Sequence, residues 1–251
     1  TVAVMGPNAK DSVMMWGNYN GVPAHTVTVL DGIRAALGKG DKLIYEQGCP
    51  CVGDDLLESV FSECKSESRP GFSARYWNNV NHEGKVDVET RVMTPFNFCT
   101  SGATVFAPGV NLTDFSATYN ATYVPKASGE VIFDVYSFGK GRLLVNQKEA
   151  MSFYNSHGGN KQLYALQVEA GKKYDIELQF EYLQSDAQLN FDMGFKKKVD
   201  IAKSVNAVRN ADVVVFVGGI SPSLEGEEMG VDLPGFKQGD RISIELPGVQ
   251  R

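Results

Sequence analysis

The sequence predicts an incomplete α/β parallel-sheet (sandwich) domain with an inserted all-β antiparallel barrel or sandwich module. In residues 1–68, short apolar runs alternate with helical apolar spacing, and a similar pattern returns in residues 199–251. In residues 69–198, apolar side chains recur at every second position instead. Apolar runs that alternate with helices are typical of parallel sheets, whereas a period of two between turn residues is typical of antiparallel ones. We therefore expect a first and a second part of one α/β domain, separated by the inserted module.

The first part contains two expected strands and two expected helices. The run VAVMG at residues 2–6 predicts a central strand, and KLIYEQG predicts a second one. Between them, TVLDGIRAALGKG has apolar residues on one helical face and ends in glycine, which predicts a helix. The segment GDDLLESVFSEC also has helical apolar spacing, so we expect another helix there.

The middle of the chain has the periodicity of antiparallel strands. The segments FSATYNATYV, EVIFDVY, YDIELQFEYL and LNFDMGF each alternate apolar and polar residues, and Gly, Asn and Ser turns separate them. Such alternation predicts strands with one face buried. Their number favours a sandwich or a barrel.

The last part returns to the first pattern. VDIAKSVNAVRNA aligns Ile201, Val205 and Val208 on one side of an expected helix. DVVVFVGG follows as an apolar run, which predicts a parallel strand covered on both faces.

Composition excludes several classes of function. The chain of 251 residues has 24 basic and 30 acidic residues and a net charge of −6, so we expect no nucleic-acid partner. It has no apolar run long enough for a membrane span. Its four cysteines and three histidines lack zinc-ligand spacing, and we expect no metal and no cofactor. The sequence leaves open whether Cys49 or Cys51 forms a disulfide with Cys64 or all stay buried thiols.

Three loops follow the expected parallel strands, and ligands of open parallel sheets bind at such loops. The first loop carries Trp16, Asn18 and Tyr19. Aromatic faces with an amide nearby suit the apolar faces and hydroxyl groups of a sugar ring. We therefore predict that these three residues bind substrate.

The third loop carries Glu225, Glu227 and Glu228 within four positions. An acidic cluster of this kind is either a solvated turn or a source of acid catalysis. Hydrolysis of a glycosidic bond needs one carboxylic acid and a second carboxylate as nucleophile or base. The loop can supply the first of these, and the rest of the chain offers no convincing second carboxylate.

Both ends of the chain resemble the C-terminal half of glycoside hydrolase family 3, the β-glucosidases and β-xylosidases. The resemblance is carried by VAVMGPNA, GNYNGVP, TVLDGI, YEQGC and ADVVVFVGGISPSLEGEEM with the later LPGVQR. These motifs cover about half of the chain. Members of the family place a barrel domain before this region, and that barrel carries the nucleophilic aspartate. The resemblance thus implies that the sequence is part of a longer protein.

The middle of the chain resembles the protective-antigen-type β-barrel that some members carry as an insertion. Its opening strand is aromatic, with Phe72, Tyr76 and Trp77. In many such modules, acidic residues after the central strand bind calcium. Here that turn reads YSFGKGRLLVNQ, which has no carboxylate, so calcium is not implied.

The resemblance implies a retaining, exo-acting β-glycosidase for β-linked gluco- or xylo-oligosaccharides. Glu225 matches the acid/base position, and Glu227 and Glu228 are alternatives because the register of the loop is open. Tyr76 and Trp77 either contact a distal sugar or belong to the core. The family also suggests a periplasmic or secreted location.

The chain by itself is expected to be inactive, because the nucleophile lies on the barrel domain of the same polypeptide. The alternative function is a carbohydrate-binding module on an α/β carrier, without catalysis.

Overall fold

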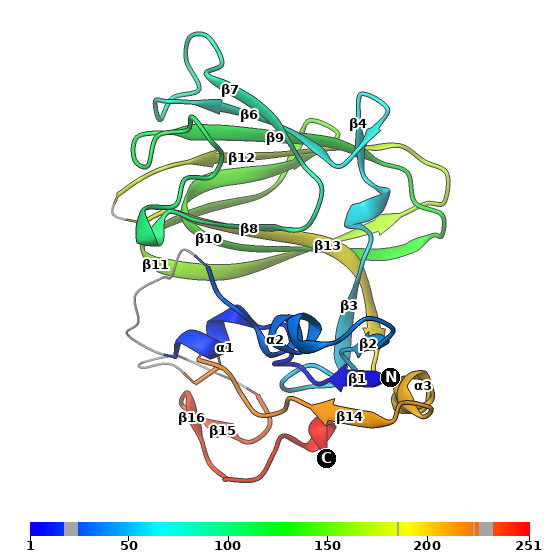
Figure 1. Cartoon of the computed structure of the whole chain (residues 1–251). Helices are drawn as coiled ribbons and strands as arrows, with labels where there is room; N and C mark the ends of the chain where they lie inside the picture. Colours follow the sequence, from blue (N-terminus) through cyan, green and yellow to red (C-terminus); the bar gives the residue numbers. More distant parts are fainter. Residues whose placement is uncertain (18–24, 185, 223, 226–232) are drawn as a thin grey trace. The chain divides into compact units, whose positions relative to one another are not determined.

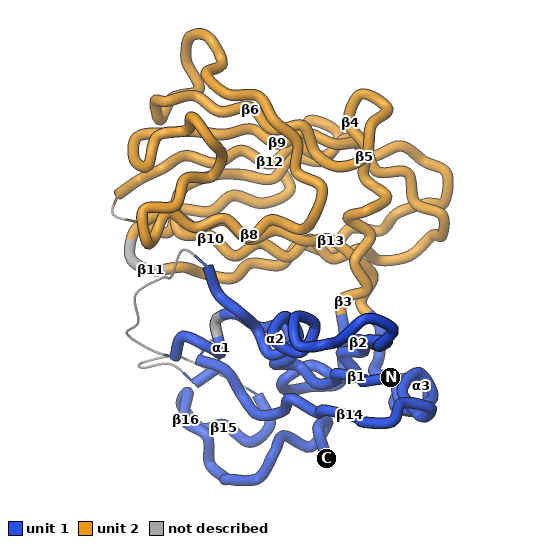
Figure 2. The backbone as a smooth tube through the Cα atoms, viewed as in Figure 1, with its two compact units in different colours: residues 1–56, 197–251 blue, residues 57–196 orange. Residues whose placement is uncertain are grey.

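The structure is a computed structural model that describes residues 1–17, 25–184, 186–222, 224–225 and 233–251 (Figure 1). The chain forms two compact units, with unit 1 made of Thr1–Leu56 and Lys197–Arg251 and unit 2 of Leu57–Lys196 (Figure 2). The three-part division expected from the sequence stays a prediction.

Unit 1 contains a three-stranded parallel sheet in the order β14-β1-β2. Its elements are β1 (Val2–Met5), α1 (Ser12–Trp16), α2 (Val29–Ala36), β2 (Leu43–Glu46), α3 (Ile201–Val208), β14 (Val213–Phe216), β15 (Phe236–Lys237), β16 (Asp240–Arg241) and the 3-10 turn η3 (Gly248–Gln250). Val2 of the central strand pairs with Val213 on one side and Leu43 on the other. Helices α2 and α3 confirm two expected helices.

The N-termini of α2 and α3 have side-chain caps. At α2, the Thr28 hydroxyl accepts a hydrogen bond from the Asp31 amide, and the Asp31 carboxylate accepts one from the Thr28 amide. At α3, the Asp200 carboxylate accepts from the Lys203 amide at 2.9 Å. These bonds satisfy amide groups that have no partner inside the helix, which explains why both helices begin where they do.

Unit 2 contains most of an 11-stranded sheet. Its elements are β3 (Asp55–Ser59), η1 (Phe61–Glu63), β4 (Lys65–Ser66), β5 (Arg69–Pro70), β6 (Phe72–Trp77), β7 (Val88–Val92), β8 (Phe96–Cys99), η2 (Ser101–Ala103), β9 (Ser116–Tyr123), β10 (Gly129–Val145), β11 (Lys148–Val168), β12 (Tyr174–Glu181) and β13 (Gln188–Lys198). The first residues of β3 and the last two of β13 belong to unit 1. The described registers of this sheet are antiparallel.

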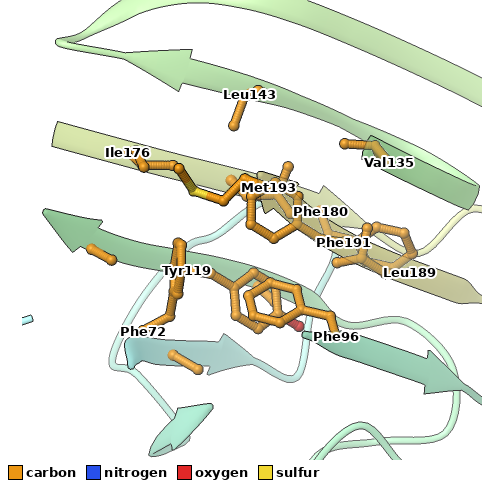
Figure 3. Close-up of a cluster of buried hydrophobic side chains, with 14 of the residues drawn as sticks. Phe72, Phe96, Tyr119, Val135, Leu143, Ile176, Phe180, Leu189, Phe191 and Met193 are labelled. Atoms are coloured by element: carbon orange, nitrogen blue, oxygen red, sulfur yellow. The ribbon is translucent and has the colours of Figure 1, made fainter. Parts of the chain in front are cut away.

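The core of unit 2 is built from the alternating apolar residues that the sequence shows. Tyr119 of β9, Phe133 of β10, Phe180 of β12 and Phe191 of β13 are fully buried there. Figure 3 shows many of these core side chains between the strands of the sheet. The expected antiparallel strands with one buried face are therefore confirmed at β9, β10, β12 and β13.

The predicted fold class, an α/β parallel-sheet (sandwich) domain with an inserted module, is wrong for this chain. Among the described residues, parallel pairing is confined to β14, β1 and β2, whereas the larger sheet is antiparallel. The three α-helices of the described residues have only five, eight and eight residues. Three parallel strands are too few to organise the chain, and the antiparallel strands hold most of the buried apolar residues. No described helix has both the length and the apolar character needed to cross a membrane.

The predicted helix at GDDLLESVFSEC is also wrong, because β3 and η1 occupy this segment. Strand β3 neighbours β13 in the sheet, and the Val60 amide that follows it donates to the Met193 carbonyl at 2.9 Å. Phe61 and Cys64 then enter the core of unit 2. The apolar spacing that suggested a helix instead supplies one strand and one short turn.

Strand β14 is not covered on both faces, contrary to the prediction. Val213, Val214 and Phe216 are between 44% and 54% exposed. Ile201 and Val205 of α3 are also about half exposed. Strand β14 lies at the edge of the described sheet, and the described apolar cluster of unit 1 around Val4, Ala9 and Leu30 contains none of its residues.

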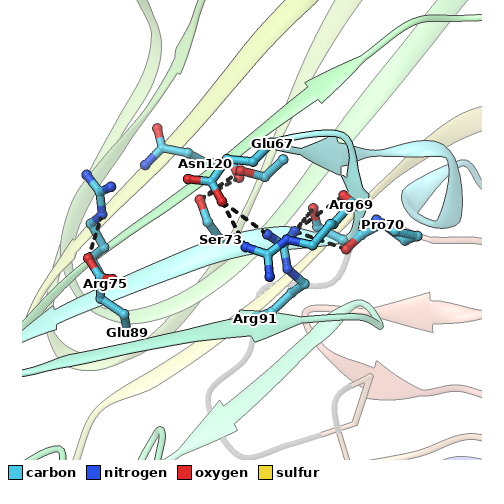
Figure 4. A network of polar contacts seen from close by, with 10 residues as sticks. Glu67, Arg69, Pro70, Ser73, Arg75, Glu89, Arg91 and Asn120 are labelled. Atoms are coloured by element: carbon cyan, nitrogen blue, oxygen red, sulfur yellow. Dashed lines mark hydrogen bonds and ion pairs between the residues drawn. The ribbon is translucent and has the colours of Figure 1, made fainter.

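A polar network holds the hairpin between β4 and β5 (Figure 4). Glu67 and Ser68 take positive φ angles of 52° and 63° in its turn. The Arg91 guanidinium donates to the Arg69 and Pro70 carbonyls at 3.3 and 3.1 Å. The hydrogen bond from Arg69 lowers the pKa of Glu67. The hairpin is thus tied to β7 by side-chain bonds to its backbone.

The four cysteines are free thiols in the structure. Cys64 is buried in unit 2, and burial raises its pKa to about 12. Cys51 lies in unit 1, where burial raises its pKa to about 11. Of the two arrangements that the sequence left open, the structure shows the free thiols.

Candidate functional site

Three strand-end loops of unit 1 meet at one edge of the parallel sheet. Residues 6–11 follow β1, residues 47–53 follow β2 and residues 217–225 follow β14. The Gly6 amide donates to the Gln47 carbonyl at 3.1 Å, which joins the first two loops. Because the strands are parallel, all three loops leave from the same edge. This edge is where a ligand of such a sheet is expected.

Glycine at position 6 allows the first and third loops to approach closely. Gly6 has a φ of +101°, and a Cβ atom there would lie 2.3 Å from the Val217 carbonyl oxygen. Any larger residue would push the two backbones apart. The Asn8 amide also donates to the Val217 carbonyl at 3.2 Å. The start of the third loop is therefore fixed against the first.

The Asn8 side chain links all three loops. It is almost fully buried, and its Nδ2 atom donates to the carbonyls of Gly218 and Ile220 at 3.2 and 3.3 Å. Its Oδ1 atom accepts from the Cys51 thiol at 3.3 Å. Since the pKa of Cys51 is raised to about 11, the thiol keeps its proton at neutral pH and acts as the donor.

A second carboxamide, Gln250 of η3, binds the same loops. Its Oε1 atom accepts from the Gly219 amide at 2.7 Å. Its Nε2 atom donates to the carbonyls of Gly219 and Cys51, both at 2.7 Å. Gln250 therefore satisfies both backbone groups of Gly219 and joins the loops after β2 and β14.

Glu225 lies at the end of the described part of the third loop. Its amide donates to the Ser221 carbonyl at 3.2 Å, and the Leu224 amide donates to the same carbonyl at 2.9 Å. The Glu225 side chain is half-buried, and its Oε1 atom accepts from the Arg241 amide at 3.0 Å. The backbone of Arg241 thus orients the carboxylate.

The Arg241 side chain organises the segment that faces Glu225. Its guanidinium donates to the Gly235 carbonyl at 2.9 Å and to the Glu245 carbonyl at 2.8 Å. It also lies over the Phe236 ring, 5.2 Å from the ring centroid. These contacts hold the segment that presents the Arg241 amide to the glutamate.

An open pocket of about 540 Å³ lies beside Glu225. It is lined by Gly219, Ile220, Glu225 and residues 241–247. The lining contains two carboxylates, those of Glu225 and Glu245. Glu245 is exposed and forms an ion pair with Arg251, whereas Glu225 is held by the Arg241 backbone. A positioned carboxyl group at the wall of a pocket can exchange a proton with a bound ligand.

Of the other residues that the sequence suggested in unit 1, the structure describes Trp16, which does not line this pocket. Trp16 ends α1 and is half-buried, and its Nε1 atom donates to the Thr26 hydroxyl at 2.7 Å. Asn18, Tyr19, Glu227 and Glu228 lie outside the described residues. Among the predicted site residues that the structure describes, Glu225 alone contributes to the pocket.

Tyr76 and Trp77 lie on β6 of unit 2. Tyr76 is 0% exposed, its ring packs 5.8 Å from that of Tyr119, and burial raises its pKa to about 12. Trp77 is partly buried and packs against His82 with 5.2 Å between ring centroids. A fully buried ring has no face to offer a sugar, so the proposed site does not include Tyr76.

Sequence reasoning missed four residues that build the site: Asn8, Arg241, Glu245 and Gln250. Asn8 and Gln250 stand in the motifs GPNA and LPGVQR, next to glycine-containing turns. A carboxamide beside such a turn is a signal for backbone capping. The sequence does not show which backbone groups the carboxamide binds, so this signal does not identify its hydrogen-bond partners. Within the described parts of the chain, no group of three or more His, Cys, Asp or Glu residues is placed to hold a metal ion.

Comparison with protein families and curated proteins gives three results. The family model of the glycosyl hydrolase family 3 C-terminal domain matches residues 1–251. The chain is 40% identical over 254 residues to Xylan 1,4-beta-xylosidase of Xylanibacter ruminicola, covering 100% of the chain and 29% of that protein. It is 30% identical over 271 residues to Beta-glucosidase of Rhizobium radiobacter, covering 99% of the chain and 30% of that protein. The chain thus spans less than a third of the length of these relatives.

The structure is also similar to a crystal structure of Beta-glucosidase from Kluyveromyces marxianus in complex with glucose. The TM-score is 0.56 at 17% sequence identity, over 99% of this chain and 31% of that one. At this identity the similarity shows the fold alone.

Proposed function

Because the chain belongs to the glycosyl hydrolase family 3 C-terminal domain family, we propose that it is part of a longer retaining β-glycosidase. In this proposal the enzyme removes β-linked xylose or glucose from the non-reducing end of oligosaccharides. The names of the two curated relatives, a xylosidase and a glucosidase, support this substrate class. The observation that carries the proposal is the position of Glu225 at the wall of an open pocket beside the strand-end loops.

Glu225 is the proposed acid/base, and Glu227 and Glu228 remain alternatives. In the first step, Glu225 donates its proton to the glycosidic oxygen while a nucleophilic carboxylate attacks the anomeric carbon and the bond to the leaving sugar breaks. In the second step, the Glu225 carboxylate takes a proton from water, and the oxygen of that water displaces the nucleophile. The nucleophile is expected on the preceding barrel domain of the longer polypeptide.

The first test compares the full-length enzyme with the isolated 251-residue chain on nitrophenyl β-xyloside and β-glucoside. The full-length enzyme should hydrolyse at least one substrate and should retain the anomeric configuration, as followed by proton NMR. The isolated chain should show no turnover, because it supplies only one of the two groups that the reaction needs. Robust turnover by the isolated chain, or inversion by the full-length enzyme, would contradict the proposal.

Two further properties belong to the same proposal. The higher identity to the xylosidase supports β-xylosides as the first substrates to test. A periplasmic or secreted location would suit an enzyme that acts on such oligosaccharides.

A second function, sugar binding without catalysis, is favoured by an open groove on unit 2. The groove has a volume of about 720 Å³ and is lined by Lys140, Gly141, Arg142, Glu149, Ser152, Phe153, Tyr154, Gln179 and Glu181. Tyr154 is 66% exposed, so most of its ring is free for stacking. Lys140 pairs with Glu181 at 2.7 Å, and the Arg142 Nε atom donates to Gln179 at 2.7 Å. An exposed ring beside such polar groups suits a neutral sugar chain.

The Tyr154→Ala variant tests this second function. Loss of a stacking ring should weaken the binding of xylohexaose about ten-fold, as measured by titration calorimetry with the full chain. The control is Leu163→Ala on the same strand, since Leu163 is also exposed but does not line the groove. The groove has no sugar-binding role if the unchanged chain shows no binding at millimolar xylohexaose.

A further inference from the structure

The backbone that leads to Glu225 is held by two carboxamide side chains. After β14, the polar backbone groups of Gly218, Gly219 and Ile220 are bound by Asn8 and Gln250. Gly219 has a φ of +109°, and this sharp turn exposes its amide and its carbonyl to Gln250. The geometry of the loop therefore depends on side chains from distant parts of the sequence.

Gln250 binds Gly219 in the way a neighbouring strand would. It accepts from the Gly219 amide, donates to the Gly219 carbonyl and uses its remaining proton for the Cys51 carbonyl. Only a carboxamide has an acceptor and two donors at this spacing. A glutamate at position 250 would keep the acceptor, but it would place a negative oxygen against two carbonyl oxygens. That change removes both donor bonds with almost no change in shape.

The anchored glycine lies only six residues before Glu225. Gly219, Ile220 and Glu225 all line the same pocket, and Glu225 is bonded back to Ser221 within this short segment. The loop is thus fixed at Gly219 by Gln250, and the carboxylate is fixed by the Arg241 amide. A displacement of the first anchor would move the carboxyl group relative to a bound substrate.

We infer that Gln250 is a positioning residue for proton transfer by Glu225. This inference rests on the proposed function of Glu225 as the acid/base. A misplacement of about 1 Å in a catalytic group can cost about 10²-fold in rate. The effect should appear only where the reaction needs a proton from Glu225.

The test uses Gln250→Glu in the full-length enzyme and two substrates with different leaving groups. The leaving group of xylobiose is a xylose unit, which is a poor leaving group as an alkoxide and needs general acid catalysis. The leaving group of 2,4-dinitrophenyl β-xyloside is a stable phenolate, which needs none. The parameter is kcat/KM, which reports the steps up to the glycosyl-enzyme. We expect kcat/KM to fall about ten-fold or more for xylobiose and less than about two-fold for the dinitrophenyl substrate.

Three further variants make the result interpretable. Gln250→Ala removes the same bonds without adding charge, and it should show the same selective loss. Asn206→Asp makes the same amide-to-acid change at an exposed residue of α3, outside the three strand-end loops, and should leave both values unchanged. Equal losses for both substrates in the Gln250 variants, or no loss, would overturn the inference. Measuring Glu225→Gln on both substrates separates the two proposals, because a selective loss there supports the acid/base role even when the Gln250 variants show none.

Discussion

Replacement of Glu225 with glutamine in the full-length enzyme is expected to lower kcat/KM for xylobiose by about 10²–10⁴-fold, the usual contribution of general acid catalysis. Glutamine has nearly the same shape, and its carbonyl oxygen can still accept from the Arg241 amide that binds the carboxylate at 3.0 Å. The variant should therefore keep its fold and lose only the transferable proton. For 2,4-dinitrophenyl β-xyloside, kcat/KM should change little, because that leaving group needs no proton.

Added azide provides an independent check on the role of Glu225. Azide attacks the glycosyl-enzyme without base assistance, so it should accelerate turnover of the dinitrophenyl substrate by the Glu225→Ala variant and form the β-xylosyl azide. Glu245→Gln is the matched control, since Glu245 lines the same pocket but is exposed and paired with Arg251. A large selective loss in Glu227→Gln or Glu228→Gln, with Glu225→Gln active, would move the acid/base to that residue.

Replacement of Phe191 with alanine is expected to reduce the free energy of unfolding of unit 2 by about 3–5 kcal/mol, as for other buried phenylalanines. Phe191 is almost fully buried on β13. Its ring centroid lies 5.7 Å from that of Phe72, 5.2 Å from Phe96 and 6.4 Å from both Phe61 and Phe133. These partners come from η1, β6, β8 and β10, so alanine would leave a cavity where five elements meet.

Urea unfolding of the full chain, followed by far-UV circular dichroism, measures this loss. It is a large fraction of the stability of an ordinary domain, about 5–15 kcal/mol, so the transition of unit 2 should move to much lower urea concentrations. Phe191→Leu should cost less because it leaves a smaller cavity, and Leu163→Ala on the exposed face should cost about 0.5 kcal/mol or less. A loss below about 1 kcal/mol for Phe191→Ala would show that the core relaxes into the cavity.

The local pattern of the sequence predicted the antiparallel strands well. In β9, β10, β12 and β13 most buried residues fall at every second position, as the alternation of Tyr119, Phe133, Phe180 and Phe191 with polar neighbours indicated. This success has a simple cause, because successive side chains of any strand point to opposite faces. The family resemblance was confirmed in the same way, from motifs that stand in the sequence itself.

Among the predictions that depended on pairing partners, β1 is the central strand that was expected, but three others were wrong. Residues 55–59 have helical apolar spacing but form β3, because β13 offers them a strand to pair with. The apolar run of β14 suggested a strand covered on both faces, yet β14 lies at an edge with Val214 half exposed. The fold class was wrong for the same reason. The residue pattern of a single segment does not show how many parallel and antiparallel neighbours the strand will have.

The sequence by itself determined that β9, β10, β12 and β13 are strands with one buried face, which family the chain belongs to and which loop carries the candidate acid. Only the tertiary structure decided what surrounds Glu225. Asn8 and Gln250 are more than 200 positions apart in the chain, and each binds a carbonyl or amide of the same loop. Parallel strands bring their carboxyl ends to one edge whatever their separation in sequence, and the contacts that orient this loop therefore exist only after the sheet has formed.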